Sequence, residues 1–349
     1  DQQGKERARH FPRKVDAQKW LDEVTTATLT GQYVDPQRSR ATIEAMAATW
    51  LGSHPGWSAS TRLRNKGIVD NYVLPTWGKA KLVDVDHEGL QAWVAELTGK
   101  LSGGSVRKVA GVMSGILATA VAAKRLAVNP MATVKLPKQA LAKRRYLSAG
   151  QVEAMATAAG NHSPIVYTLA YCGLRIGELA ALRIANVDQV RRRLQVEQSV
   201  TSVNGTMVWS SPKDHQRRSV PYPDFLDKPI AARLDGRAAD ALLFPSPKGD
   251  VLRVDNMRRD WFNAAAAQAG VPGLTPHELR HTAASLAVSA GASVLALQRM
   301  LGHEKASMTL DVYSDLFDED LDDVAERMAS ARADFLRTEA ASRLTIVPS

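Results

Sequence analysis

Two stretches of helical periodicity, separated by a short basic connection, constrain the fold of this chain more than any other feature. The connection, LPKQALAKRRYL, combines a proline with several Lys and Arg residues. Such a composition is typical of a segment between domains, and 349 residues are enough for two hydrophobic cores. We therefore predict an N-terminal segment over 1–37, a helical domain over 38–135, a linker over 136–147, a second domain over 148–317 and a C-terminal helix and tail over 318–349.

The first domain is predicted to be a bundle of about four helices. Asp86 can cap one helix, and Ser105 can start another after the break that Gly103 and Gly104 make in the pattern. An earlier helix is expected to end at Pro75. Some basic residues lie near helix starts or on exposed faces and are candidate DNA contacts, although an ordinary solvated face is the simpler interpretation of any single one. They are Arg62, Arg64, Lys66, Arg107 and Lys108.

The second domain opens with a helix and then changes to extended segments. Ser148 and Gln151 form the capping-box pattern S-x-x-Q, which predicts a helix start. LQVEQSV and TMVWSSP flank Asn204 and Gly205, a turn signal for a β-hairpin, and QRRSVPYP follows as a third extended piece. The helical pattern returns after Pro223. We therefore predict a mainly α fold with a small antiparallel β-sheet in the second domain.

Four short motifs in the second domain carry residue types that bind or attack a phosphate. In TPHELRH, Thr275 can cap a helix, which places His277 and Arg280 three residues apart on one face. Histidine transfers protons near neutral pH, and arginine can hold two phosphate oxygens. By itself, this pair occurs by chance in many helices. The other motifs are GLRIGELAAL with Arg175 at a helix start, the turn after the hairpin with Lys213, and LGHEKASMTLDVYSD with His303 and Tyr313.

With these motifs in order, the sequence resembles the tyrosine recombinases, specifically the phage integrases. The matching pieces are GLRIGEL, SPKDHQRRSVPYP, HELRH, LGH and the T-x-x-x-Y that runs from Thr309 to Tyr313. The helical region over 38–135 resembles the core-binding domain of the family by its pattern. The segment before residue 38 resembles the end of an arm-binding module.

The resemblance implies an attack on a DNA phosphodiester without a metal. Arg175 and Arg280 are expected to hold the non-bridging oxygens, because a guanidinium matches two oxygens and stays charged. Tyr313 is the expected nucleophile, and His277 is a candidate to take its proton. His303 is expected to donate to the same phosphate or to help the leaving group.

The same resemblance suggests roles for two further residues. Lys213 is expected to protonate the departing 5′-oxygen as a general acid. Many relatives carry a threonine and a small residue after this lysine, whereas this chain has Asp214 and His215, which leaves the geometry of the hairpin open. Glu178 stands one helical turn beyond Arg175, where it either orients a neighbouring side chain or is an ordinary surface glutamate.

The composition fits a partner that carries negative charge. Lys and Arg number 45 against 36 Asp and Glu, a formal net charge of +9, and such an excess attracts polyanions. The linker residues Lys143, Arg144 and Arg145 are therefore further candidate DNA contacts. The resemblance implies double-stranded DNA attachment sites as partners and a homotetramer on DNA, and it leaves room for a DNA-bending accessory protein.

Other features of the sequence indicate where the protein acts and whether it needs a metal or a cofactor. Cys172 is the single cysteine and lies in an apolar run, so we expect it to pack in a core. The sequence lacks an uninterrupted apolar stretch of membrane-spanning length, and its first residues lack the apolar centre of a signal peptide. We therefore expect a cytoplasmic, nucleoid-associated protein in a bacterial host, with no membrane partner. Neither zinc-ligand spacing nor a phosphate-binding loop is found, so no metal and no cofactor are expected.

Two alternatives to a phage-type integrase stay open. The first is a plasmid or chromosome dimer resolvase with the same chemistry, against which the extra segment before residue 38 argues. The second is a sequence-specific DNA-binding protein that does not catalyse, against which the complete set of candidate catalytic residues argues.

The C-terminal segment has the pattern of an amphipathic helix over 318–341. Asp residues cluster at its start, where a helix dipole favours negative charge. Apolar residues then recur at helical spacing, namely Leu321, Val324, Met328 and Phe335. This helix is expected either to pack on its own catalytic domain or to dock on a neighbouring protomer.

Overall fold

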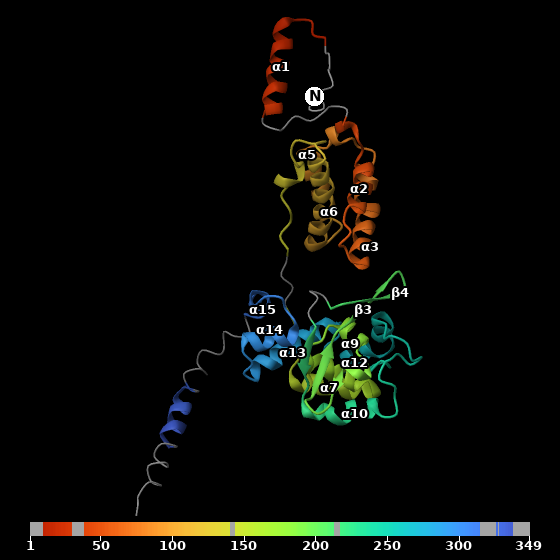
Figure 1. Cartoon of the computed structure of the whole chain (residues 1–349), viewed down its shortest axis with the longest axis vertical. Helices are drawn as coiled ribbons and strands as arrows, with labels where there is room; N and C mark the ends of the chain where they lie inside the picture. The colour runs from red at the N-terminus through yellow and green to blue at the C-terminus, as the bar shows by residue number, and fades with distance from the viewer. Residues whose placement is uncertain are drawn as a thin grey trace, which may run out of the picture. The chain divides into compact units, whose positions relative to one another are not determined.

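The computed structural model describes residues 10–29, 38–139, 144–212, 217–314, 326 and 328–337. The chain forms two compact units, Asp1–Ala142 and Lys143–Ser349. Figure 1 shows helices in the first unit and helices combined with short strands in the second. The prediction of a mainly α fold with antiparallel strands in the second domain is thus confirmed. Lys143 and Lys213, two of the candidate site residues, lie outside the described residues.

The regular elements of the described part of the first unit are helices, with one isolated β-bridge between Thr42 and Lys81. Its α-helices are α1 (Lys14–Leu29), α2 (Ile43–Gly52), α3 (Ala59–Ile68), α4 (Leu74–Trp77), α5 (His87–Thr98) and α6 (Gly103–Ala122). Shorter helical turns are the 3-10 turns Arg38–Arg40, Leu82–Asp84 and Pro130–Thr133 and the wider π-helical turn Val69–Val73. Helices α2, α5 and α6 share one apolar core, in which Ile43, Leu90 and Ile116 are fully buried.

Two predicted helix boundaries in this unit are wrong. Gly103 and Gly104 do not break the chain but form the first turn of α6. Ser102 rather than Ser105 is the N-cap, because the Ser102 hydroxyl accepts a hydrogen bond from the Ser105 backbone N–H at 3.3 Å. Pro75 does not end a helix either. It lies in the first turn of α4, where the missing backbone N–H is tolerated.

The starts of α5 and α1 each have an aspartate nearby, and at α5 this residue is the predicted cap. The cap at Asp86 is confirmed, since its Oδ1 accepts from the Gly89 backbone N–H at 2.8 Å. Helix α1 starts at Lys14, and Asp16 lies in its first turn, where it pairs with Arg13 at 2.9 Å.

Helix α6 is long and apolar enough to cross a membrane by length and composition alone. Its apolar residues have another use in this fold. Val109, Met113 and Ile116 are buried against the other helices of the unit. The apolar character of α6 is therefore accounted for by the core of the first unit.

The second unit surrounds its strands with helices. The helices are α7 (Ala149–Ala159), α8 (Ser163–Cys172), α9 (Ile176–Ala181), α10 (Asp227–Leu234), α11 (Val254–Met257), α12 (Asn263–Gln268), α13 (Pro276–Ser289), α14 (Val294–Leu301) and α15 (Ala306–Tyr313). The strands are β1 (Val187–Asp188), β2 (Arg193–Val196), β3 (Ser199–Val203), β4 (Thr206–Ser210) and β5 (Arg218–Pro221). The capping box predicted at Ser148 and Gln151 starts α7.

The strands form two small antiparallel sheets rather than the single sheet predicted. Strands β3 and β4 make the expected hairpin around Asn204 and Gly205, whose φ angles are 48° and 76°. Strand β5 does not join this hairpin. It pairs with β2, with Leu194 opposite Val220, and β2 also pairs with β1. The difference arises because LQVEQSV divides into two strands, β2 and β3, that belong to different sheets.

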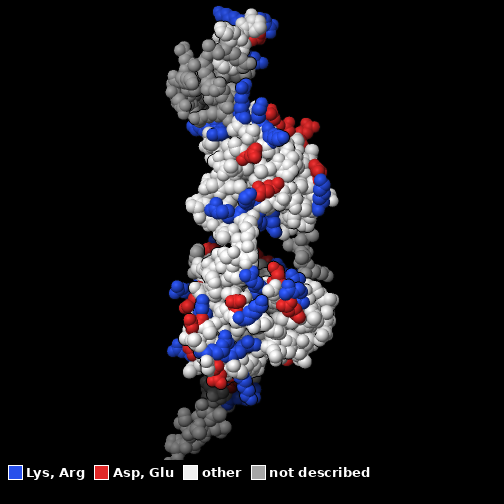
Figure 2. Space-filling view, turned by 90° about the vertical axis from the view of Figure 1, so that its right-hand side faces the viewer, with Lys and Arg blue, Asp and Glu red and all other residues white. Residues whose placement is uncertain are grey.

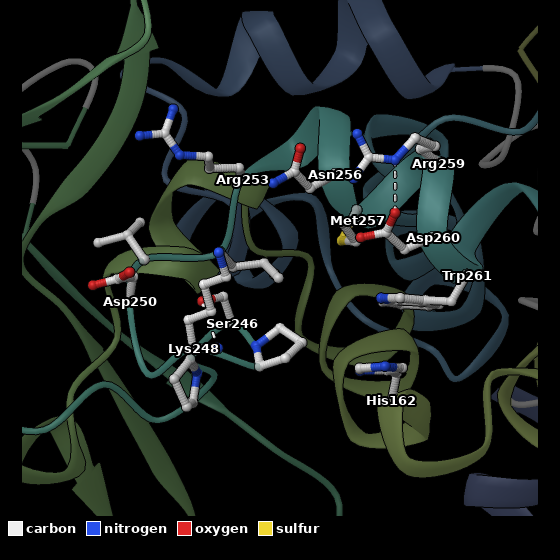
Figure 3. Close-up of a pocket in the computed structure, with 14 residues that line it drawn as sticks. His162, Ser246, Lys248, Asp250, Arg253, Asn256, Met257, Arg259, Asp260 and Trp261 are labelled. Carbon is white, nitrogen blue, oxygen red and sulfur yellow. Dashed lines mark hydrogen bonds and ion pairs between the residues drawn. The ribbon is translucent and has the colours of Figure 1, made fainter.

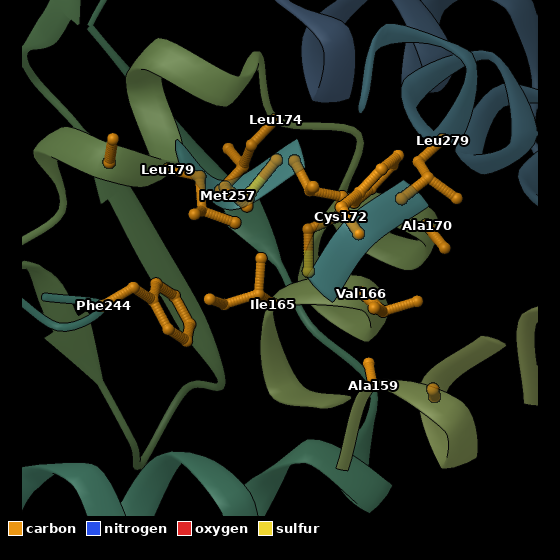
Figure 4. Packing of buried hydrophobic residues seen from close by; sticks show 14 of the residues in the cluster. Ala159, Ile165, Val166, Ala170, Cys172, Leu174, Leu179, Phe244, Met257 and Leu279 are labelled. Carbon is orange, nitrogen blue, oxygen red and sulfur yellow. The ribbon is translucent and has the colours of Figure 1, made fainter. Parts of the chain in front are cut away.

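The main core of the second unit is built around α8, which packs against α7 and α13. Figure 4 shows Cys172 of α8 within this packing, together with Met257 of α11 and Leu279 of α13. All three side chains are almost completely buried. The predicted core position of the cysteine is confirmed, and burial raises the pKa of its thiol to about 12.

The predicted C-terminal helix is confirmed only over residues 326 and 328–337, which are helical. Leu321 and Val324 lie outside the described residues. Met328 and Phe335 are 69% and 62% exposed, so the described part of the chain does not cover them.

Candidate active site

The site begins where α8 ends and α9 starts. Gly173 closes α8 in the left-handed region, with φ of 65°. A Cβ atom there would lie 2.8 Å from Leu301 Cδ2 and 3.3 Å from Ala283 Cβ, so a side chain does not fit. This close approach brings the start of α9, with Arg175 as its N-cap residue, near the middle of α13 and the end of α14. The predicted helix start at Arg175 in GLRIGEL is confirmed.

Glu178 is buried in the centre of an arginine cluster. Its carboxylate accepts from Arg175 Nη1 at 2.9 Å and from the Arg175 backbone N–H at 2.9 Å. Arg218 of β5 donates to both carboxylate oxygens, at 2.9 Å and 2.6 Å. Burial alone would raise the pKa of Glu178, but Arg218 and Arg175 outweigh it and hold the pKa below its usual value. Glu178 therefore orients neighbouring side chains and is not a surface glutamate.

Arg218 connects this cluster to a third element. Its Nε donates to the backbone carbonyl of Met300 in α14 at 3.0 Å. A Cβ atom on Gly302 would lie within 3.0 Å of the Arg218 guanidinium, so the glycine in LGH leaves room for this arginine. Arg218 thus ties β5 to both α9 and α14.

Arg280 is held from two sides although it is only 2% exposed. Its Nη1 donates to the Gly173 carbonyl and its Nη2 to the Leu301 carbonyl, both at 2.7 Å. Burial lowers the pKa of Arg280 to about 9, and the charge of Arg175 acts in the same direction. The guanidinium remains protonated at neutral pH and supplies a fixed positive charge.

The helix that carries Arg280 starts as predicted. Thr275 precedes α13, and its backbone N–H and hydroxyl both donate to Glu278, at 2.7 Å and 2.9 Å. His277 and Arg280 lie three residues apart, but their surroundings differ: His277 is exposed whereas Arg280 is buried. The two side chains therefore do not share one face of α13 as predicted, because that of His277 lies in solvent and that of Arg280 in the interior.

His303, which follows α14, lies beside Tyr313 at the end of α15. The His303 Nδ1 lies 2.9 Å from the hydroxyl of Thr309, which is fully buried in α15. The rings of His303 and Tyr313 are nearly parallel, with centroids 6.3 Å apart. The threonine of the T-x-x-x-Y motif thus fixes the ring of His303 next to the tyrosine.

Tyr313 is the last residue of α15 and is 1% exposed. Its hydroxyl lies 2.8 Å from the Nδ1 of His281, the residue after Arg280 in α13. Burial raises the pKa of Tyr313 to about 12, although Arg280 opposes the shift. Burial, followed by the charge of His277, lowers the pKa of His281 to about 4. At neutral pH the phenol is therefore protonated and the imidazole neutral, and the phenol donates to Nδ1 in the tautomer whose proton is on Nε2.

The structure brings together most of the candidate catalytic residues. Arg175, Glu178, Arg280, His303 and Tyr313 all lie where α8, α9, α13, α14 and α15 converge. His277 is on the same helix as Arg280, with its ring 4.7 Å from that of His281. Two residues of this site, Arg218 and His281, were not predicted. Their only sequence signals are the second arginine of QRRSV and the last histidine of HELRH.

The candidate DNA contacts are distributed differently. Figure 2 shows Lys and Arg spread over this face of the protein and interspersed with Asp and Glu. Four candidates bond to the protein itself: Arg62 to the carbonyls of Leu51 and His54, Lys66 to Asp70, Arg107 to the carbonyl of Pro137, and Arg145 to Glu278 and the carbonyl of Pro272. Arg64 and Lys108 line an open hollow of about 260 Å³ between α3 and α6. Arg144 is exposed.

A larger hollow of the second unit has a different lining. It has a volume of about 500 Å³, and Figure 3 shows His162 stacked on Trp261 at its edge, with Arg259 paired to Asp260. None of the candidate catalytic residues lines it. The candidate catalytic residues thus gather in the charged cluster around Tyr313 and not in this hollow.

Comparison with known proteins relates both units to one family. Residues 145–320 match the family described as "Phage integrase family", and residues 43–136 match "Phage integrase central domain". A Mycobacterium tuberculosis protein named as a prophage phiRv2 integrase is 27% identical, over 86% of this chain and 82% of that protein. The integrase of Mycobacterium phage L5 is 24% identical, over 91% of this chain and 90% of the phage protein.

Solved structures show the same fold. The Tn1549 transposon integrase in complex with transposon right end DNA has a TM-score of 0.71 at 19% identity, over 82% of this chain and all of that one. A lambda integrase dimer bound to a COC′ core site has a TM-score of 0.62 at 18% identity, over 91% of this chain and 90% of that one. The resemblance inferred from the motifs is confirmed: the chain belongs to the phage integrase family and is a site-specific tyrosine recombinase, an enzyme that cleaves and rejoins DNA.

Proposed function

We propose that this recombinase cuts double-stranded DNA attachment sites by attack of Tyr313 on a phosphodiester held between Arg175 and Arg280. The observation that carries the proposal is the placement of a buried tyrosine hydroxyl within a cluster of fixed arginine and histidine side chains. Preorganised positive charge stabilises the negative charge that grows on phosphate oxygens during attack. The attack leaves a 3′-phosphotyrosine and a free 5′-hydroxyl.

The remaining residues act on the same phosphate. His303, fixed by Thr309, donates to a phosphate oxygen, and His277 contacts the phosphate from the exposed side of α13. Lys213 protonates the 5′-oxygen as it departs, because an alkoxide is a poor leaving group. Glu178 and Arg218 position Arg175 without touching DNA.

Rejoining reverses these steps on the partner duplex. The free 5′-hydroxyl attacks the phosphotyrosine, so the energy of the broken bond is kept and ATP is not needed. Two duplexes with two protomers each make a tetramer on DNA. A DNA-bending accessory protein is a further proposed partner, and the protein is proposed to act at the nucleoid of a bacterial host cell.

The C-terminal helix is proposed to join protomers in this tetramer. Its support is the exposure of apolar residues that an isolated chain leaves in water: Met328, Phe335 and Leu336. Deletion of residues 318–349 is expected to weaken tetramer assembly on DNA more than single-site binding, as measured by sedimentation of the complexes. A truncated protein that is unfolded as a monomer would contradict this assignment, because the helix would then belong to its own core.

The nucleophile is tested with a nicked suicide duplex, on which the covalent protein–DNA product accumulates. Tyr313→Phe is expected to abolish this product and to leave duplex affinity near wild type, because only the hydroxyl is lost. The matched control is Tyr171→Phe, a tyrosine of the core that lies away from the charged cluster, which is expected to cleave normally. A persistent covalent product with Tyr313→Phe would refute the assignment.

The general acid is tested with a modified leaving group. Lys213→Ala is expected to cleave ordinary DNA poorly and to recover in part on a duplex with a 5′-bridging phosphorothiolate, whose sulfur departs without a proton. Wild type is expected to gain little from the same substrate. Equal gains in both proteins would remove Lys213 from this role.

A further inference from the structure

We propose that His281 is a catalytic residue of this recombinase: its Nδ1 accepts the phenolic proton of Tyr313 during cleavage and returns it during rejoining. The inference rests on the proposed role of Tyr313 as nucleophile. It reassigns the proton acceptor from His277, the expected candidate, to the neighbouring histidine of HELRH. The first support is the distance of 2.8 Å between the phenol oxygen and the imidazole nitrogen.

That distance meets the geometric requirement for a general base. A base must lie within about 2.6–3.2 Å of the atom that loses the proton. His281 is the partner of the phenol oxygen among the described residues, whereas His277 is exposed and one helical turn earlier on α13. The contact joins two separate helices, α13 and α15, so it is a property of the folded site and not of local sequence.

The proton balance of the step is complete. In cleavage, the O–H bond of Tyr313 breaks as its oxygen bonds to phosphorus, and the proton moves to His281 Nδ1. The bond from phosphorus to the 5′-oxygen breaks, and that oxygen takes a proton from Lys213. In rejoining, the 5′-hydroxyl gives its proton to Lys213, and the departing phenol oxygen takes back the proton from His281.

Burial and nearby charges together set the pKa of His281. Burial is the largest cause of the lowered pKa; His277, Arg144 and Arg280 lower it further, and Glu278 opposes them. The imidazole is therefore neutral in the free protein and carries the lone pair that a base needs. A DNA phosphate that binds beside Arg280 adds negative charge, which raises the pKa of the imidazole and favours its protonated form.

In the free protein, the pKa values of the two groups disfavour proton transfer from Tyr313 to His281. Tyr313 holds its proton firmly, with a pKa of about 12, and His281 accepts one weakly, with a pKa of about 4. Transfer becomes favourable as the phenol oxygen bonds to phosphorus, because the proton on that oxygen then becomes strongly acidic.

The test is the single-turnover rate of covalent product formation by the full chain on the nicked suicide duplex. His281→Asn places an amide oxygen near the position of Nδ1, so it can accept a hydrogen bond but cannot take the proton. His281→Asn and His281→Ala are both expected to lose roughly 10²–10⁴-fold in rate. Duplex affinity and the midpoint of thermal unfolding should stay near wild type. The matched control, His162→Asn, changes a stacked histidine remote from the site and should cleave normally.

A second measurement separates proton transfer from simple positioning. Replacement of Tyr313 by 3,5-difluorotyrosine makes the phenol more acidic, so the defect of His281→Asn should shrink several-fold in that background. The cleavage rate of His281→Asn should also rise more steeply with pH than that of wild type, because solvent must remove the proton.

Two results would overturn the assignment. A wild-type rate for His281→Asn would show that the imidazole only holds the hydroxyl, and a defect unchanged by fluorination would show that it positions the tyrosine without taking its proton. Either result leaves the nucleophile assignment standing if Tyr313→Phe is inactive. A covalent product with Tyr313→Phe would instead refute the proposed function itself.

Discussion

The candidate catalytic residues of the second unit are held differently from two candidate DNA contacts of the first unit, Arg64 and Lys108. In the second unit Arg280 is 2% exposed and is fixed by two backbone carbonyls, while Glu178 binds two arginines in the interior. In the first unit Arg64 and Lys108 line an open hollow at the surface. Groups that stabilise a transition state must be in place before the reaction, whereas groups that attract a polyanion act over a distance from flexible positions. We therefore expect substitutions in the two units to change different measured quantities.

The largest expected effect comes from replacing a fixed guanidinium. Arg175→Lys and Arg280→Lys keep a positive charge but lose the planar fork, so the rate of covalent product formation should fall by about 10²–10³-fold. Arg64→Lys, the matched change in the first unit, should leave this rate unchanged. Single-turnover cleavage at saturating protein separates the rate from affinity. A normal rate for both site variants would show that the fixed guanidinium groups do not stabilise the transition state.

A smaller effect is expected on stability when the buried carboxylate loses its charge. Glu178→Gln leaves Arg218 without its ion pair in the interior and should lower the free energy of unfolding by about 3 kcal/mol near pH 7. Urea unfolding would measure this change. A loss within experimental error would show that the cluster does not support the fold.

The pH dependence of stability gives the same ion pair a distinct signature. The folded pKa of Glu178 is lowered, so its contribution to stability is present above the unfolded pKa and is lost as pH falls through the folded pKa. The stability difference between wild type and Glu178→Gln should therefore narrow as the pH is lowered from neutral into the acidic range. A difference that stays constant through this range would contradict the assignment.

The smallest effects are expected in the first unit. Arg64→Ala and Lys108→Ala should each weaken duplex binding by a small factor and reduce the slope of log affinity against log salt by about 1. The affinity of wild type should fall steeply and linearly on the same plot. A nearly flat salt dependence for wild type would contradict the interpretation of the +9 charge as a DNA-binding charge.

Much of the second unit could be predicted from short sequence patterns, because its candidate catalytic residues lie next to residues that start or end helices. Gly173 and Gly302 end helices in the left-handed region, and Thr275 precedes α13, so the motifs around them could be placed on helix ends from the sequence. The Asn204–Gly205 hairpin follows the same logic. Each of these features depends on residues that are close together in the chain.

The missed features depend on residues that are far apart in the chain. Arg218 binds Glu178 across forty residues, and His281 meets Tyr313 across thirty-two. No local pattern distinguishes these two residues from an ordinary surface arginine or core histidine. Gly103 was misread for a related reason: it lies against the carbonyl of Lys138, where a Cβ atom would approach to 2.6 Å, and a glycine used for close packing resembles a helix break in sequence.

The most direct test of this account is to identify the residue that becomes linked to DNA. The covalent product from the nicked suicide duplex is digested with protease and nuclease, and the nucleotide-bearing peptide is sequenced by mass spectrometry. The expected result is a 3′-phosphate ester on the Tyr313 side chain. A DNA link on any other residue, such as the nearby Tyr146, would contradict it.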